Sequence, residues 1–287
     1  MNSRLAHMEL HFAVLLFGTA GLFGKLVPAD PATIVLGRTV FAALAIFAAL
    51  RFSPVPLSIV PGRSRWLLPA SGLVLALHWL TFFHAIQIST VAIGLVGFAS
   101  FPVFVTFLEP LVSRQTLRGV DILSALIVVI GLLLVAPSFE LNDAGTAGLA
   151  WAVVSGALFA VLTLMNRPLV ASNSFMVVAF YQQITAALVL IPFALPLRQM
   201  PETRTLWLLL VLGVICTALP HLLFIKSLRA LKAQLVSIVT GLEPVYGIAL
   251  AALLLGEIPA LNTLLGAALI FAAVWLATRA HNAPVRP

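Results

Sequence analysis

The sequence predicts an all-α integral membrane protein in which ten transmembrane helices form two inverted five-helix repeats around a central cavity. The prediction depends on the composition, on a series of long apolar runs and on the similarity of the two halves. Of the 287 residues, 62% are apolar and 9% are charged, and the mean hydropathy is +1.14. A soluble domain has about 25% charged residues. So few charges cannot cover this much apolar surface in water, which excludes a soluble enzyme, a secreted disulfide scaffold and a disordered regulator.

The apolar runs have the length and continuity of membrane-spanning helices. A chain in hydrocarbon must satisfy its own backbone hydrogen bonds, so only helices or a closed barrel can span it. A barrel would show segments of about ten residues that alternate between apolar and polar, and these runs do not alternate. No small-x-small cleavage site follows the first run, so we expect a retained helix there. We expect spans at residues 10–27, 33–52, 66–87, 90–112, 119–137, 145–166, 174–196, 205–229, 233–255 and 261–280.

Lysine and arginine are distributed unevenly between the two sides of these spans. With a cytoplasmic N-terminus, Lys25, Arg198 and Arg204 fall outside, and Arg38 lies within the second span. The other twelve basic residues fall on the cytoplasmic side: Arg4, Arg51, Arg63, Arg65, Arg114, Arg118, Arg167, Lys226, Arg229, Lys232, Arg279 and Arg286. Because positive charge is retained on the cytoplasmic side of a membrane, this excess predicts that both termini are cytoplasmic.

The two halves of the chain resemble each other at two places. Residues 38–44 align with 182–188, and Phe101-Pro102-Val103 aligns with Glu243-Pro244-Val245, at offsets of 144 and 142 residues. We therefore expect a first repeat at 1–140 and a second at 141–287. Each half has five spans, an odd number, so the second repeat must be inverted relative to the first. Inverted repeats are typical of secondary transporters, whose substrate site lies near the midplane where the repeats meet.

The second half also carries a recognisable signature. The stretch Pro244–Glu257, followed by Gly266–Ile270, resembles the ninth-to-tenth helix signature of EamA-type proteins of the drug/metabolite transporter (DMT) superfamily. A weaker copy runs from Phe101 to Gly131 in the first half. Arg38 matches an arginine that is often found early in the second helix of that family, and the glycine-rich segment Gly18–Gly24 is also similar to its first helix.

The resemblance covers the whole chain, and it implies both a fold and a function. It implies a central cavity formed by the first four helices of each half, with the fifth and tenth helices outside. It implies a secondary transporter, similar to bacterial amino acid exporters, that exports amino acids or related small metabolites across a bacterial-type cytoplasmic (inner) membrane by alternating access. One loop departs from the pattern: Ser113-Arg114-Gln115 stands where the second half has Leu255-Gly256-Glu257.

Arg38 and Glu243 lie deeper within the predicted spans than the other charged residues, at depths where an unpaired charge costs about 2.5–3.5 kcal/mol or more. Arg38 is a candidate counter-ion for a substrate carboxylate, or else an arginine that snorkels or ties helices together. Glu243 lies near the middle of the ninth span. It is a candidate proton carrier, a ligand for a substrate amine, or a buried acid that is hydrogen-bonded to a carbonyl freed by Pro244. Proton coupling and facilitated diffusion both stay open.

The third span carries the densest group of polar and aromatic residues. At 100° per residue, His78 lies beside Phe82, and Trp79 lies beside Phe83, so that one wide face is aromatic with polar tips, while His84 points away. Such a face suits a cavity for an amphipathic small molecule, because aromatic rings stack on apolar groups and attract ammonium groups. Packing or lipid contact is the alternative for each single ring.

Other spans offer further candidates for the same cavity. With the offset of 142 residues, His221 aligns with Trp79 from the opposite repeat. Phe98 and Phe101 lie one turn apart in the fourth span, and Tyr181 lies in the seventh. The complete set of predicted substrate-binding residues is Arg38, His78, Trp79, Phe82, Phe83, Phe98, Phe101, Tyr181, His221 and Glu243.

Three further charged residues near the ends of spans have simpler explanations. Glu109 lies close to Arg114, which favours an interfacial ion pair over transport. Glu257, at the outer end of the ninth span, is expected to cap a helix or anchor a loop. Lys226 lies near the cytoplasmic end of the eighth span, where a lysine can snorkel to the headgroups.

Several function classes are not indicated by any motif. The sequence has no P-loop, no metal-ligand set and no Ser-His-Asp arrangement, so we expect no cofactor, no metal and no catalytic residue. No basic aromatic surface indicates nucleic acid, and the expected partners are a small-molecule substrate and membrane lipid. The alternatives are a sugar, nucleotide-sugar or drug carrier of the same superfamily, and less favoured, a membrane-embedded enzyme or a scaffold. The substrate, the direction of transport and the choice between monomer and homodimer stay open.

Overall fold

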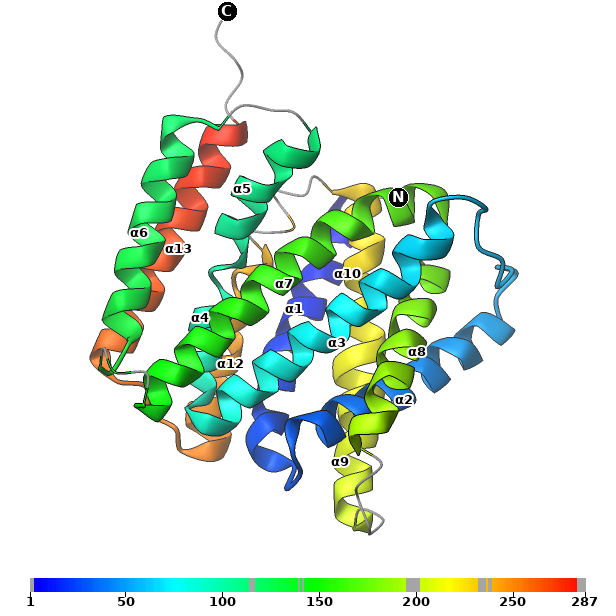
Figure 1. Cartoon of the computed structure of the whole chain (residues 1–287), viewed down its shortest axis with the longest axis horizontal. Coiled ribbons are helices and arrows are strands. Elements are labelled where there is room, and N and C mark those ends of the chain that lie inside the picture. The colour runs from blue at the N-terminus through cyan, green and yellow to red at the C-terminus, as the bar shows by residue number, and fades with distance from the viewer. Residues whose placement is uncertain are drawn as a thin grey trace, which may run out of the picture.

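A computed structural model describes residues 3–113, 117–138, 140, 142–194, 202–231, 236 and 239–282. Within these residues the regular structure is helical and contains no strand, which confirms the predicted all-α class. The helices, drawn in Figure 1, are α1 Ser3–Leu26, α2 Pro31–Arg51, α3 Ser64–Ile88, α4 Val91–Phe98, α5 Phe101–Ser113, α6 Gly119–Val135, α7 Ala144–Ser172, α8 Phe175–Ala194, α9 Thr203–Gly213, the π-helical turn η1 Val214–Ala218, α10 Leu219–Ala230, α12 Glu243–Leu255 and α13 Leu261–Asn282.

Seven stretches of the described chain are helical, apolar and long enough to cross a membrane. These stretches are Leu5–Leu26, Pro31–Arg51, Ser64–Ile88, Val91–Pro110, Ala144–Ser172, Phe175–Phe193 and Thr203–Ser227. The remaining three predicted spans coincide with shorter apolar helices, Gly119–Val135, Glu243–Leu255 and Leu261–Leu276. At 1.5 Å per residue, α6 is about 26 Å long, a little less than a hydrocarbon core of about 30 Å. The first part of the predicted span 233–255 lies largely outside the described residues.

Helices α2, α4 and α7 begin at capping residues in the loops that the sequence marks. Asp30 accepts hydrogen bonds from the amides of Ala32 and Thr33 at 2.9 and 3.1 Å, and so caps α2. The hydroxyl of Thr90 caps α4, and the carboxylate of Asp143 caps α7. Each cap satisfies amides that have no partner within the helix. These caps fix where each helix enters the bundle.

Two predicted spans are interrupted in the structure. The span expected at 90–112 consists of α4 and α5, separated by a turn at Ala99–Ser100 immediately before Phe101-Pro102. In the second half, a turn at residues 241–242 precedes Glu243-Pro244, the start of α12. The expectation of continuous helices was wrong at these points because proline has no amide hydrogen to donate. Proline is tolerated in the first turn of a helix, where that hydrogen would have no partner in the helix.

A third proline coincides with a change of helix type rather than a break. The helical stretch from α9 to α10 widens into the π-helical turn η1 just before Pro220. In this turn the amide of Leu219 donates to the carbonyl of Val214, five residues earlier. Single π-helical turns within α-helices occur frequently at functional sites. The sequence predicted only a continuous span here.

Helices α6 and α13 pack against each other at one edge of the molecule (Figure 1). They approach closely at two glycines, because a Cβ atom added to Gly266 would lie 2.5 Å from the carbonyl oxygen of Gly131. Small residues allow this approach in membrane proteins. The remaining helices enclose the main core, in which α3 packs on α7, α2 on α8, and α1 on α10 and α12. The start of α1 and the end of α13 lie at the same end of the molecule (Figure 1).

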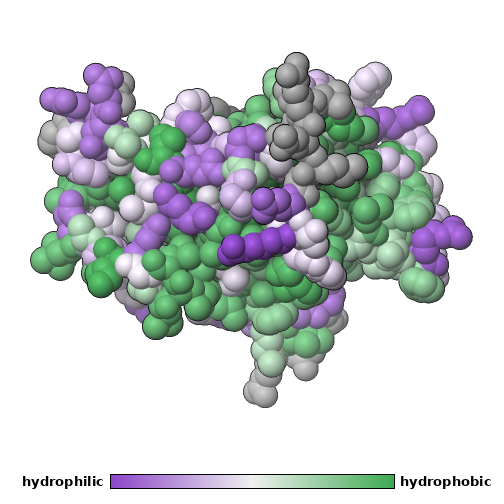
Figure 2. Space-filling model, turned by 90° about the horizontal axis from the view of Figure 1, so that it is seen from below, coloured by the Kyte–Doolittle hydropathy of each residue, from purple (hydrophilic) through white to green (hydrophobic). Residues whose placement is uncertain are grey.

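Large apolar side chains cover the outside of the bundle. On α6 they include Ile122, Leu126 and Leu133, which are all more than half exposed. Figure 2 looks onto the end of the molecule that is lowest in Figure 1, and it shows hydrophilic residues among extensive hydrophobic surface. Exposed apolar surface of this extent on helices suits contact with lipid.

Candidate functional site

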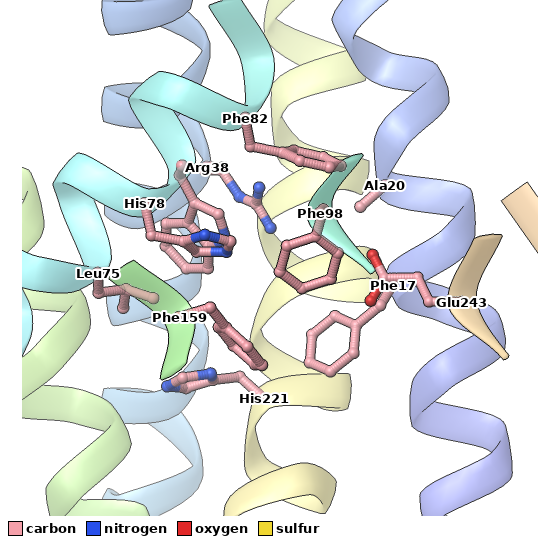
Figure 3. Close-up of a pocket in the computed structure, with 11 residues that line it drawn as sticks. Phe17, Ala20, Arg38, Leu75, His78, Phe82, Phe98, Phe159, His221 and Glu243 are labelled. Carbon is pink, nitrogen blue, oxygen red and sulfur yellow. The ribbon is translucent and has the colours of Figure 1, made fainter. Parts of the chain in front are cut away.

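A pocket lies inside the bundle, between helices from both halves of the chain (Figure 3). Its cavity volume is about 30 Å³, so the pocket is narrow in this conformation. Its lining comes from α1, α2, α3, α4, α7, α10 and α12: Phe17, Ala20, Arg38, Leu75, His78, Trp79, Phe82, Phe98, Phe159, His221 and Glu243. It therefore combines a ring-rich apolar surface with one cation, one carboxylate and two imidazoles.

Seven of the ten residues that the sequence selected line this pocket. They are Arg38, His78, Trp79, Phe82, Phe98, His221 and Glu243. The other three lie elsewhere. Phe83 is fully buried next to Gly24, and Phe101 stacks on Phe98 from outside the lining. The hydroxyl of Tyr181 donates to the carbonyl oxygen of Leu57 at 3.3 Å, in the loop between α2 and α3.

Arg38 is 1% exposed, although it is a charged side chain in the middle of an apolar bundle. Its Nε donates to the hydroxyl oxygen of Thr217 at 3.0 Å. Its guanidinium carbon lies 3.9 Å from the ring centroid of Trp79 and 5.2 Å from that of Phe83. Burying a charge is costly unless it has partners, and these contacts supply a hydrogen bond and cation–π attraction. Its interaction with Glu243 is also attractive.

Glu243 is the first residue of α12, whereas the sequence placed it in the middle of a span. The turn before Pro244 moves it to a helix N-terminus, where the helix dipole favours a negative charge. Helix α1 packs tightly against this point. A Cβ atom added to Gly18 would lie 2.9 Å from both the carbonyl oxygen of Glu243 and the amide nitrogen of Gly247. Glycine at position 18 is therefore what lets α1 and α12 close one side of the pocket.

His78 is held by Ser155 of α7. The His78 Nδ1 lies 3.1 Å from the Ser155 carbonyl oxygen and 2.8 Å from its hydroxyl oxygen. The hydroxyl proton is already donated to the carbonyl oxygen of His78, and a carbonyl can only accept. We therefore assign the proton of the neutral ring to Nδ1, which makes Nε2 the acceptor nitrogen.

His221 is held by a chain of buried amides. The Gln182 Nε2 donates to Ser71 Oγ at 3.0 Å and to Asn166 Oδ1 at 2.6 Å. The Gln182 Oε1 is thus the accepting end of the amide, and His221 Nε2 donates to it across 3.0 Å. This leaves Nδ1 as the acceptor of the neutral His221 ring. Trp79 lies beside it, with ring centroids 6.3 Å apart.

The rest of the lining is a connected group of aromatic rings. Phe159 of α7 has its ring centroid 5.0 Å from that of His78, 5.3 Å from that of Phe98 and 5.7 Å from that of Phe224. These separations lie in the range of favourable aromatic contacts. The sequence also offered Phe159, in the span 145–166, but it did not select Phe17, Ala20 or Leu75. On α3 the spacing of Leu75 from His78 and Phe82 was a usable signal, because i, i+3 and i+7 share one helix face.

Polar contacts outside the pocket hold the ends of the bundle. Lys226 of α10 pairs with Glu9 of α1 across 2.7 Å, so it does more than reach toward the headgroups. Glu109 pairs with Arg167, whereas the sequence suggested Arg114, which lies outside the described residues. The carboxylate of Glu257 accepts from the amide of Val91 at 2.9 Å, which confirms that this residue anchors a helix start.

The described part of the chain contains no group of three or more His, Cys, Asp or Glu side chains that could hold a metal ion. What it does contain is an internal pocket, surrounded by membrane-length helices from both halves and lined by polar groups that face apolar rings. This arrangement is that of a polytopic membrane transporter.

The model of the EamA-like transporter family matches residues 8–136 and again 146–279. The chain therefore belongs to the EamA-like transporter family, within the DMT superfamily, and the resemblance found in the sequence is confirmed.

Two relatives are similar over nearly the whole chain. The protein is 26% identical over 276 residues to "Uncharacterized transporter YxxF" of Bacillus subtilis (strain 168), with 94% of this chain and 88% of the relative covered. It is 27% identical over 284 residues to an "Uncharacterized transporter" of Archaeoglobus fulgidus, with 96% and 97% covered. A solved structure described as "Crystal structure of protein" matches with a TM-score of 0.72 and 18% identity, and covers 98% of this chain and 99% of that one. At this identity the structural match shows the fold alone.

Proposed function

We propose that this transporter exports amino acids or related small metabolites across a bacterial-type cytoplasmic membrane by alternating access. The observation that supports the proposal is the pocket, in which Arg38, Glu243 and a continuous aromatic surface meet. A free amino acid carries a carboxylate, an ammonium group and a side chain. The pocket offers a complementary group to each.

The expected roles follow from the chemistry of each group. The Arg38 guanidinium suits a carboxylate, because its planar N–H groups match two carboxylate oxygens. Glu243 and the acceptor nitrogens of His78 and His221 suit an ammonium group. The rings of Trp79, Phe82, Phe98 and Phe159 suit an apolar or aromatic side chain. Phe83, Phe101 and Tyr181 are assigned no direct contact with the substrate.

The alternating-access part of the proposal requires two inverted repeats, 1–140 and 141–287. Two pairs of helices that begin at equivalent positions support it. Helix α5 begins at Phe101 and α12 at Glu243, while α6 begins at Gly119 and α13 at Leu261. Each pair is separated by 142 residues (243 minus 101, and 261 minus 119). The double match of the family model supports the same division. The excess of basic residues in alternate connections supports cytoplasmic termini.

The alternative carriers have less support from the pocket. A sugar phosphate or nucleotide sugar needs several cations, and the lining holds one, Arg38. An amphipathic drug would suit the rings but would leave the opposed charges of Arg38 and Glu243 unused. A membrane-embedded enzyme is less favoured, because both similar proteins are named as transporters.

The test is uptake by purified protein in liposomes, with a panel of labelled amino acids and with or without a pH gradient. Trp79→Ala and Glu243→Gln should each lower saturable uptake by about tenfold or more, because each removes a group that faces the substrate. The matched controls are Trp66→Ala and Glu202→Gln, at exposed positions, and both should transport normally. Uptake that depends on the gradient in wild type but not in Glu243→Gln would assign proton coupling to Glu243. Absence of amino acid flux in folded wild-type protein would overturn the proposed function.

A further inference from the structure

The π-helical turn η1 lies directly against Arg38. A Cβ atom added to Gly213, at the start of this turn, would lie 2.8 Å from the carbonyl oxygen of Arg38 and 2.5 Å from the Cβ of Phe41. Glycine therefore lets the turn contact the backbone of α2. The turn carries Thr217, which is completely buried and faces the Arg38 side chain.

The hydrogen bonds of Thr217 fix the direction of its hydroxyl group. Its single proton is donated to the carbonyl oxygen of Leu212, five residues earlier, at 2.7 Å. Toward Arg38 it can therefore only accept, and it accepts from Nε at 3.0 Å. In a regular α-helix the carbonyl oxygen of Leu212 would accept from the amide four residues later, that of Cys216. Its contact with Thr217, five residues later, therefore depends on the wider π-helical turn.

This contact determines which part of the guanidinium is left for a ligand. Of the five N–H groups of Arg38, the one on Nε is used by Thr217, and one face of the plane is covered by Trp79 at 3.9 Å. The other four N–H groups are on the two Nη atoms, at the edge that binds a carboxylate with two parallel hydrogen bonds. Figure 3 shows the guanidinium extending into the space between the rings.

We propose that Thr217 is a positioning residue, which with Trp79 holds Arg38 so that the Nη edge receives an anionic carboxylate in the pocket. The inference rests on the proposed function, which identifies the pocket as the substrate site. It adds that Thr217 makes this site selective for a carboxylate. Thr217 does not touch the substrate. It acts through the orientation of Arg38, as supporting residues do around other binding groups.

The test separates the two charged ends of an amino acid. The probes are 3-phenylpropionate, which keeps the carboxylate and the ring, and phenethylamine, which keeps the ammonium group and the ring. Binding is measured from the ligand-dependent rise in melting temperature of the purified full chain, which needs no transport. In Thr217→Val, the Kd for 3-phenylpropionate should rise about tenfold, since a hydrogen bond that orients a charged group is lost. The Kd for phenethylamine should change less than about twofold.

Two further variants keep the result interpretable. Thr217→Ser retains the hydroxyl and should restore binding of 3-phenylpropionate, which a purely steric role would not predict. Thr163→Val removes another buried threonine hydroxyl, one that donates to the carbonyl oxygen of Phe159 in its own helix, and it should leave both Kd values unchanged. Equal loss of both probes in Thr217→Val, or no loss of either, would overturn the inference. So would a wild-type protein that 3-phenylpropionate does not stabilise. If the binding results hold but liposomes show no amino acid flux, the inference stands and the proposed transport function fails.

Discussion

The two halves of the chain interrupt their helices at matching positions but place different side chains there. In the first half, a turn precedes Phe101-Pro102, and Phe101 stacks on Phe98 with ring centroids 5.4 Å apart. In the second half, a turn precedes Glu243-Pro244, and the Glu243 carboxylate itself lines the pocket, whereas Phe101 only supports the lining residue Phe98. The proline accounts for the break in the backbone, while the residue before it is not constrained to one chemistry. Similar backbones can thus build a pocket that is aromatic on one side and acidic on the other.

The same contrast is found at contacts away from the pocket. Lys226 pairs with Glu9 between α10 and α1. The residues 142 positions away are His84 and Trp151, and their rings meet edge to face between α3 and α7, with centroids 5.4 Å apart. One contact depends on charge and the other on ring packing. The ionic contact should therefore respond to salt and to charge exchange, whereas the aromatic one should not.

The largest expected effect comes from making the two halves alike at Arg38. The aligned residue of the second half is Gln182, so Arg38→Gln removes the difference. Uptake at low substrate concentration should fall about 100-fold, because removing one partner of a buried charge interaction costs about 2–5 kcal/mol. The measurement is initial uptake in liposomes. Arg51→Gln, at the exposed end of α2, is the control and should transport normally. Uptake within twofold of wild type in folded Arg38→Gln protein would contradict a carboxylate site.

A smaller effect is expected from the ionic contact between Glu9 and Lys226. The two side chains are 17% and 29% exposed, so the pair should contribute no more than about 1 kcal/mol. Cys216 is the only cysteine in the chain and is buried in η1 near Arg38, so its reaction rate with a permeant maleimide reports opening of the bundle at η1. Lys226→Gln should raise this rate about threefold, because a contact that holds α10 against α1 is weakened.

The exchange of charges provides the control for this prediction. The double variant Glu9→Lys/Lys226→Glu should return the labelling rate to the wild-type value. High salt should accelerate labelling of the wild-type protein but not of Lys226→Gln. Trp151→Ala weakens the aromatic counterpart and should keep the salt dependence. A labelling rate that is insensitive to salt in the wild-type protein would show that the pair does not hold the bundle closed.

Much of the fold followed from local features of the sequence. Apolar runs and the residues between them located the helices, because lipid requires continuous backbone hydrogen bonding. The turn before Phe101 and the π-helical turn before Pro220 were not predicted. A proline within an apolar run is compatible with a kink, a break or a wider turn, and hydropathy does not distinguish among these.

The site was partly predictable for a similar reason. The polar residues Arg38, His78, His221 and Glu243 stood out because such groups avoid lipid. Phe17 and Ala20 did not, since a helix that is apolar all round gives no sign of which face lines a pocket. Thr217 carried no signal at all, because its role depends on a wide turn that brings it to Arg38 from 179 residues away.

The smallest effect is expected at Tyr181, one of the residues that the sequence placed in the site and the structure places elsewhere. Tyr181→Phe removes a hydroxyl that reaches the loop carbonyl of Leu57, and neither residue lines the pocket. Uptake should stay within about twofold of wild type, and the free energy of unfolding should fall by no more than about 1 kcal/mol, the usual value of one partly exposed hydrogen bond. The measurements are initial uptake and melting temperature, beside Trp79→Ala as the variant that loses uptake. A fivefold rise in KM with an unchanged melting temperature would place Tyr181 on the substrate path. The pocket would then extend across α8, and the contribution of the second half would be larger than its three lining residues indicate.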